Sequence, residues 1–82
     1  MSKKYNGWSN YWTHNTFTWI TSYENTYRYF EELAEDYPFS RFKEEVEAFI
    51  KIGSIDAESL EEIREAIDTV NYKEIRDGLL GD

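Results

Sequence analysis

The sequence predicts an all-α protein, a compact bundle of four to five short helices with an irregular N-terminal arm. Apolar residues recur at helical spacing over most of the chain. Pro38, Gly53 and Gly81 divide these segments, as helix-ending residues do. With 82 residues the chain is long enough for one domain only. We therefore expect a single helical domain over residues 1–82, with residues 1–9 as the arm.

The first predicted helix covers residues 11–21 and follows Ser9 or Asn10 as its N-cap. The threonines in this segment favour a strand instead, because β-branching restricts χ1. A strand without a partner would leave its backbone groups unpaired, however, and the chain offers no second strand. Helical spacing relates Trp12, Thr16, Trp19, Ile20 and Tyr23. This spacing favours the helix.

The next two helices are separated by Pro38, which ends the earlier one. We expect the second helix over residues 23–36, with Ser22 as its cap, and the third from residues 38–40 to just before Gly53. The buried stripe of the second is Tyr23, Tyr27, Phe30, Leu33, Ala34 and Tyr37. The buried face of the third is Phe39, Phe42, Val46, Phe49 and Ile50.

Two further helices complete the bundle. The fourth is expected from residue 56 or 57 to 69, with Asp56 as its cap. Residues 71–74 form an asparagine version of a capping box, which predicts a short last helix that Gly81 ends. The inward residues are Leu60, Ile63, Ile67 and Val70 in the fourth helix, and Tyr72, Ile75 and Leu79 in the last.

Composition limits where the protein works. The chain has no cysteine, which excludes disulfides, thiolate zinc sites and thiol nucleophiles. Because small secreted domains usually rely on disulfides, this composition favours an intracellular location. No apolar segment approaches the roughly 18 residues of a membrane span. The charged start, Met1-Ser2-Lys3-Lys4, is not followed by the apolar run of a signal peptide. We expect a soluble cytoplasmic protein that does not enter a membrane.

The net charge of −8 is unevenly distributed. Residues 1–30 carry three basic and one acidic side chain, a net of +2, whereas residues 31–82 carry six basic and sixteen acidic side chains, a net of −10. Ten of the fifteen aromatic residues lie in residues 1–30. The chain therefore has an aromatic, nearly neutral front and an acidic remainder.

The opening Asn6-Gly7-Trp8-Ser9-Asn10-Tyr11, with Thr13, Asn15 and Trp19-Ile20 after it, resembles a family of small, uncharacterised proteins of bacteriophages and mobile elements. That family opens with N-G-W-S/T-N-Y-x-T-x-N and often ends with V-N-W/Y-x-E-I, to which residues 70–75 are similar. Trp12 stands where the family often has an acidic residue, and His14 and Tyr72 stand where it often has tryptophan. The resemblance implies a phage-like context and no particular chemistry.

All three tryptophans lie within twelve residues, so they form either the core or a contact surface. In the second case Trp8, Tyr11 and Trp12 are exposed anchors that Tyr29 enlarges, because tryptophan and tyrosine are common interface hot spots. Such a patch could also stack single-stranded bases. Residues 1–30 carry only three basic side chains, however, and the acidic remainder of the chain repels phosphate. Binding to nucleic acid is therefore disfavoured. A homodimer through the same patch is also compatible with the sequence.

The acidic residues are the second candidate contact surface. Exposed carboxylates usually do no more than solvate a helix face. Alternatively they imitate nucleic acid, since residues 58–68 place five carboxylates along about 15 Å of helix, whereas duplex DNA carries one charge per about 1.7 Å. We expect these carboxylates to form one outward surface that meets a basic channel in another protein. The residues concerned are Glu31, Glu35, Glu44, Glu58, Glu61, Glu62 and Glu65.

Catalysis is not expected. His14 is the sole histidine, and no serine or cysteine nucleophile stands at a recognisable spacing from it. The sequence contains no glycine-rich phosphate loop and no set of metal ligands, so we predict no catalytic residue, metal or cofactor. The favoured hypothesis is a phage-type inhibitor of a host nucleic-acid-binding defence enzyme, in the manner of an anti-CRISPR or anti-restriction DNA mimic. The alternative is a small phage domain that binds nucleic acid or self-assembles through its aromatic front.

Overall fold

The computed structural model describes residues 8–53, 55 and 57–81, and this part of the chain contains five helices and no strand. The helices are α2 (Tyr11–Thr21), α3 (Glu24–Asp36), α4 (Phe39–Lys51), α5 (Leu60–Thr69) and α6 (Tyr72–Leu79). The predicted all-α bundle is therefore confirmed. Of the predicted arm, only Trp8 and Ser9 lie among the described residues.

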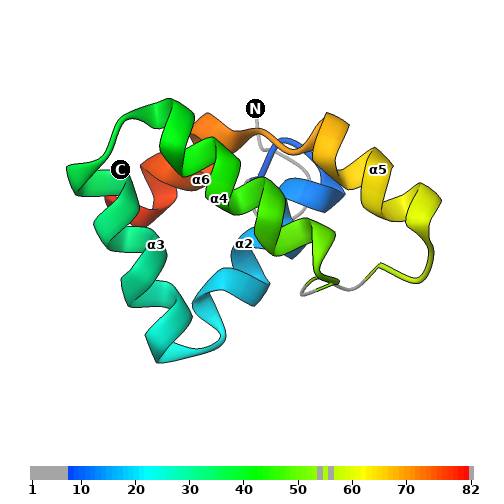
Figure 1. The fold of residues 1–82 in the computed structure, drawn as a ribbon, viewed down its shortest axis with the longest axis horizontal. Coiled ribbons are helices and arrows are strands. Elements are labelled where there is room, and N and C mark those ends of the chain that lie inside the picture. The colour runs from blue at the N-terminus through cyan, green and yellow to red at the C-terminus, as the bar shows by residue number, and fades with distance from the viewer. Residues whose placement is uncertain (1–7, 54, 56, 82) are drawn as a thin grey trace.

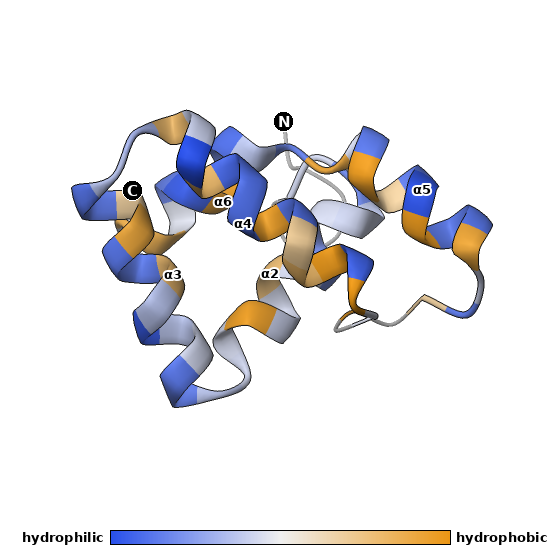
Figure 2. Cartoon of the chain, viewed as in Figure 1, coloured by the Kyte–Doolittle hydropathy of each residue, from blue (hydrophilic) through white to orange (hydrophobic). Residues whose placement is uncertain are grey.

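All five helices contribute residues to one hydrophobic core. Helix α4 packs against α3, α5 and α6, and α2 packs against the same three helices. Helices α3 and α5 lie at opposite ends of the molecule, with α4 extending between them (Figure 1). Hydrophilic and hydrophobic residues alternate along the turns of α3, α4 and α5, as amphipathic helices require (Figure 2). The large side chains with no exposed surface include Ile20, Phe42, Val46, Ile50 and Ile75.

Most helix ends follow local sequence chemistry. The side chain of Asn10 accepts a hydrogen bond from Thr13 N at 2.9 Å, and that of Asn71 accepts one from Glu74 N at 3.1 Å, as N-caps do. Gly53 and Gly81 have φ of 80° and 86° and follow the last residues of α4 and α6. Because only glycine adopts this backbone without strain, both helices end there. These four helix-end predictions are confirmed, but only half of the predicted capping box forms, because the Asn71 backbone N donates to the Thr13 hydroxyl instead of the Glu74 carboxylate.

Two helix starts differ from the prediction. Ser22 does not cap α3; its hydroxyl donates to the Thr18 carbonyl at 2.6 Å and so belongs to the end of α2. Helix α3 begins at Glu24 with no side-chain cap. Helix α5 begins at Leu60, later than expected, because Ser59 accepts from Glu62 N and supplies the cap. Asp56, the expected cap, lies outside the described residues.

Several residues expected to be buried are exposed. Helix α3 buries only Phe30, Leu33 and Ala34 of its predicted stripe. Because α3 lies at one end of the molecule (Figure 1), tyrosines at the margin of this stripe can keep their polar hydroxyl groups in water. Leu60 is exposed because it occupies the first position of α5, before that helix reaches the core. The exposed fractions are Tyr23 61%, Tyr27 38%, Tyr37 41%, Phe39 39% and Leu60 74%.

Helix α2 forms despite its threonines, and the hydroxyls of two of them bond carbonyls of the preceding turn. Thr18 donates to the His14 carbonyl at 2.8 Å, and Thr21 donates to the Phe17 carbonyl at 2.9 Å. This back-bonding gives the hydroxyl a partner without breaking the helix. The strand alternative for this segment is therefore wrong.

A set of hydrogen bonds joins the start of α2 to the connection between α5 and α6. The Thr13 hydroxyl accepts from Asn71 N at 2.8 Å and donates to Asn10 Oδ1 at 3.0 Å. Asn10 Nδ2 donates to the Thr69 carbonyl at 3.0 Å. We call this set the α2–α6 clamp. Next to the clamp, Ser9 donates from its backbone N and its hydroxyl to the Glu74 carboxylate in the first turn of α6, at 3.0 and 3.1 Å.

The clamp makes opposite predictions for two buried threonines one turn apart. Thr13→Val removes the acceptor of the Asn71 amide and should lower the free energy of unfolding by about 1–3 kcal/mol. Thr16→Val should leave stability unchanged or raise it, because the buried Thr16 hydroxyl has no hydrogen-bond partner among the described residues. Urea unfolding of both variants measures this difference. Equal losses in the two variants would contradict the clamp.

Candidate functional site

Four of the predicted contact residues meet at one pocket. Tyr11 and Trp12 of α2, together with Glu58 and Glu62 at the start of α5, line a pocket of about 260 Å³. The aromatic front and the acidic remainder of the chain therefore meet here, although the sequence separates them by more than forty residues. We call this place the Tyr11–Glu58 pocket.

The aromatic wall of the pocket is fixed from both sides. Tyr11 and Trp12 pack edge to face, with ring centroids 4.9 Å apart and planes at 69°. The Trp12 indole Nε1 donates to Glu65 Oε2 at 2.9 Å, and the Tyr11 hydroxyl accepts from Asn15 Nδ2 at 3.1 Å. Trp12 is 7% exposed, so most of its indole belongs to the core, whereas Tyr11 is 41% exposed. Tyr11 is therefore the ring that a partner reaches first.

The acidic wall is shaped by the start of α5. Glu62 Oε1 accepts from the backbone N of Glu58 at 2.8 Å, while Ser59 caps the helix. This bond holds Glu62 in place and leaves its second oxygen as an acceptor. The Glu58 carboxylate makes no hydrogen bond or ion pair with any described residue, and Glu58 is exposed. The pocket thus combines two ring surfaces with two carboxylates.

Trp8 lies elsewhere. Its ring packs on Phe17 with centroids 4.4 Å apart, and Gly78 of α6 lies so close that an added Cβ would be 2.8 Å from the Trp8 Cη2 atom. Trp8 is half-buried in this contact. The predicted patch of Trp8 and Tyr11 is therefore divided, with Trp8 covering α6 and Tyr11 facing α5.

A second hollow lies beside Tyr11. It measures about 190 Å³ and is lined by Tyr11, His14, Asn15, Thr18 and Trp19. Trp19 is only partly buried, so this ring extends the aromatic surface along α2. His14 and Asn15 were not predicted to belong to a contact surface. Their positions one turn from Tyr11 were the signal that could have placed them there.

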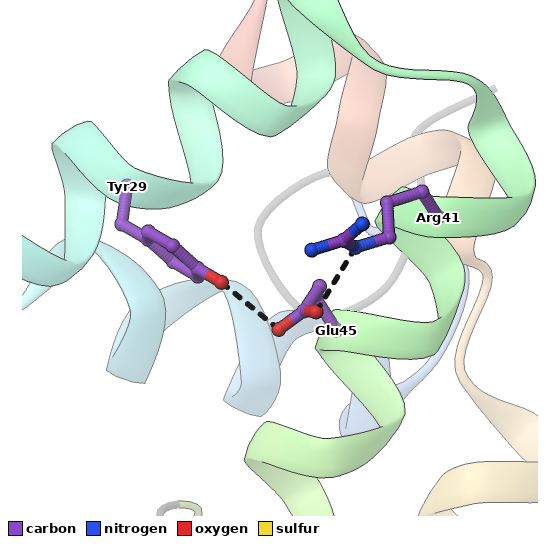
Figure 3. Close-up of polar contacts among 3 residues, drawn as sticks. All are labelled: Tyr29, Arg41 and Glu45. Atoms are coloured by element: carbon purple, nitrogen blue, oxygen red, sulfur yellow. Dashed lines mark hydrogen bonds and ion pairs between the residues drawn. The ribbon is translucent and has the colours of Figure 1, made fainter.

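Tyr29 lines a third hollow, a groove of about 470 Å³ between α3 and α4. Its hydroxyl donates to Glu45 Oε1 at 3.0 Å, and Arg41 Nε lies 3.1 Å from the other oxygen of the same carboxylate (Figure 3). Tyr29 is 50% exposed. Phe30, Phe49 and Ile52 also line the groove. Among the apolar residues that line the groove, Phe30 and Phe49 were assigned to buried faces by sequence, whereas Ala48 and Ile52 were not assigned.

The acidic residues form two surfaces instead of the one expected. Residues 58–69 carry five carboxylates against Arg64, and residues 24–36 carry five against Arg28. Between them α4 is neutral, with three acidic and three basic residues. Since α3 and α5 lie at opposite ends (Figure 1), the carboxylates of α3, which include Glu31 and Glu35, are remote from those of α5. Glu44 is exposed on α4, and Glu61 is exposed on α5.

The described basic residues neutralise few of these carboxylates. Within the described part of the chain the ion pairs are Arg28–Glu24 at 2.9 Å and Arg41–Glu45 at 3.1 Å, both between residues four apart on one helix. Neither involves α5. Exposed pairs of this kind contribute well below about 1 kcal/mol. Helix α5 therefore keeps its excess negative charge at the edge of the Tyr11–Glu58 pocket.

The chain matches no protein-family model, no curated protein and no solved structure. Among the described residues, no three histidine, aspartate or glutamate side chains stand together as ligands for a metal ion. None of the helices α2 to α6 is long and apolar enough to cross a membrane. The residues that line the Tyr11–Glu58 pocket and the α3–α4 groove are therefore the basis for inferring function.

Glu65 should stabilise the pocket wall. Glu65→Ala leaves the buried Trp12 indole N–H without its acceptor, which should lower the free energy of unfolding by about 1–2 kcal/mol. Glu61→Ala is the matched control on the same helix and should change stability by less than about 0.5 kcal/mol. Chemical unfolding, with the Trp12 indole resonance in NMR spectra, measures both. An unmoved indole resonance in Glu65→Ala would disprove the contact.

The hydrogen bond to Glu45 raises the pKa of the Tyr29 hydroxyl above its ordinary value, and burial and the negative charge of Glu45 add to the rise. Glu45→Gln should therefore lower the Tyr29 pKa, whereas Glu44→Gln should leave it unchanged. Because the folded-state pKa is raised, this contact stabilises the fold below the pKa of unfolded tyrosine, and its contribution is lost as pH rises through the folded-state pKa. NMR titration of the Tyr29 ring tests the shift. A pKa unaffected by Glu45→Gln would contradict the assigned cause.

Proposed function

We propose that this protein is a small phage-type accessory protein that binds and inhibits a host defence enzyme, at the place where that enzyme grips nucleic acid. The observation that carries this proposal is the Tyr11–Glu58 pocket, in which aromatic anchors adjoin the acidic start of α5. An anti-CRISPR or anti-restriction role in the host cytoplasm fits this surface. The resemblance of residues 6–20 and 70–75 to phage proteins supports the same context.

The charge of α5 supports binding to a basic channel. The four carboxylates of α5, a helix of about 15 Å, together with Glu58 just before it, approach the linear charge density of one strand of DNA, about one charge per 3.4 Å. Such a surface is steered electrostatically toward a channel lined with lysine and arginine. Charge complementarity raises the rate of association more than it raises affinity, whereas aromatic side chains that become buried in the interface contribute most of the affinity. The two features side by side are what a tight inhibitor needs.

Binding to nucleic acid is less well supported. The rings of Tyr11 and Trp12 adjoin two carboxylates, which repel a phosphate backbone. Self-association is the second candidate function, because Ile52 is 77% exposed beside Tyr29 at the α3–α4 groove. Apolar surface of this kind is common where copies of a chain meet. That groove is separate from α5, so charge reversal on α5 distinguishes the two functions.

A pair of charge reversals tests the proposal. The double variant Glu58→Lys/Glu61→Lys should bind purified CRISPR effectors or restriction enzymes at least roughly tenfold more weakly at low salt and should lose inhibition of DNA cleavage. Glu32→Lys/Glu35→Lys changes the net charge equally at the opposite end of the molecule and should retain most binding. Interferometry at increasing salt and a cleavage assay measure these effects.

The outcomes separate the hypotheses. Wild-type binding that weakens as salt rises, together with selective loss in the α5 variant, supports inhibition through this surface. Failure of the wild-type protein to bind any member of a broad enzyme panel would refute it. If both variants form the same oligomer as wild type, and no enzyme binds, self-association through the groove becomes the better account.

A further inference from the structure

Building on the proposed protein-binding function, we infer that the Tyr11–Glu58 pocket receives the guanidinium group of an arginine from the partner's surface. The size of the pocket supports a single side chain as the occupant. At about 260 Å³ it lies below the roughly 300–1,000 Å³ typical of pockets for drug-sized ligands. A nucleotide or cofactor would not be enclosed by it.

The charge of the pocket selects a cation. Glu58 and Glu62 line it, and none of the described residues that line it is basic. One oxygen of Glu62 is held by the Glu58 backbone N at 2.8 Å, which leaves the second Glu62 oxygen and both Glu58 oxygens as acceptors. The N-terminus of α5 contributes about half a positive charge, which the two carboxylates outweigh. The pocket therefore favours a positive group and disfavours phosphate.

The rings distinguish arginine from lysine. A guanidinium is planar, stacks on aromatic faces and donates paired hydrogen bonds to carboxylates, whereas an ammonium is a compact and strongly hydrated charge. Tyr11 is 41% exposed at the pocket and Trp12 stands edge to face beside it. Rings and carboxylates on adjacent walls thus match both sets of contacts that a guanidinium makes.

The pocket is preorganised for this occupant. Separate hydrogen bonds fix the Trp12 indole to Glu65, the Tyr11 hydroxyl to Asn15, and Glu62 to the backbone N of Glu58. Groups that are already ordered lose little conformational entropy on binding. An entering arginine would meet walls that are already in position.

Two peptides of equal charge test the inference. Acetylated and amidated tetra-arginine and tetra-lysine are titrated into isotopically labelled protein at low salt and followed by NMR. Tetra-arginine should bind roughly fivefold or more tightly than tetra-lysine. Its largest shifts should fall on the Trp12 indole and on residues 58–62. Equal affinities, or shifts centred on α3, would overturn the inference.

Matched variants locate the preference. Tyr11→Phe keeps the ring and should keep the preference for arginine, whereas Tyr11→Leu should make the two peptides equal. Circular dichroism checks that each variant remains folded. Glu58→Gln is a second test, which leaves the Tyr11 ring in place. This variant should bind tetra-arginine severalfold more weakly than wild type, and an unchanged affinity would count against the pocket. Glu32→Gln on α3 is the control and should leave the preference intact.

These results are separable from those of the proposed function. If the protein inhibits a host enzyme but shows no preference for arginine, the guanidinium pocket is wrong and the inhibitor remains. If the pocket prefers arginine but no defence enzyme binds, the pocket stands and the inhibitory function is wrong.

Discussion

The hydrogen bond from the Asn71 amide to the Thr13 hydroxyl, 2.8 Å long, is the constraint on which the rest of the structure depends. It joins the first described helix to the start of the last, across 58 positions of sequence. An N-cap amide has no partner within its own helix, so a buried hydroxyl that supplies one is costly to remove. Asn10 completes the clamp by capping α2 and bonding the Thr69 carbonyl at 3.0 Å. Asn10, Thr13 and Asn71 therefore serve the fold.

The clamp also determines what the surface can do. With the start of α2 held at the end of α5, Trp12 reaches Glu65, and Tyr11 lies beside Glu58 and Glu62. An aromatic segment and an acidic helix, each common by itself, become one pocket. The second acidic helix, α3, lies at the opposite end beyond neutral α4 and lacks these rings (Figure 1). Position, more than charge, distinguishes α5 as the candidate contact surface.

The sequence predicted those features that depend on neighbouring residues. Asn10, Asn71, Gly53 and Gly81 mark helix ends through local hydrogen bonds and backbone conformation, so their roles were visible in the chain. It did not predict contacts between distant residues, such as Trp12 with Glu65. Helical spacing placed Tyr23 on a buried stripe, but how far a neighbouring helix covers that stripe depends on packing that spacing does not encode. For the same reason the sequence identified the carboxylates of the candidate site and not their division between two ends of the molecule.

The most direct test of the clamp is the hydrogen-exchange rate of the Asn71 backbone amide. The backbone of α6 offers this amide no acceptor, because Asn71 precedes its first turn, and both oxygens of the Glu74 carboxylate accept from Ser9, so protection is expected from Thr13. The clamp predicts exchange as slow as that of the core amides, through global unfolding. Exchange at the rate of an unstructured chain would show that α2 is not fastened to α6, and the pocket that depends on this connection would lose its basis.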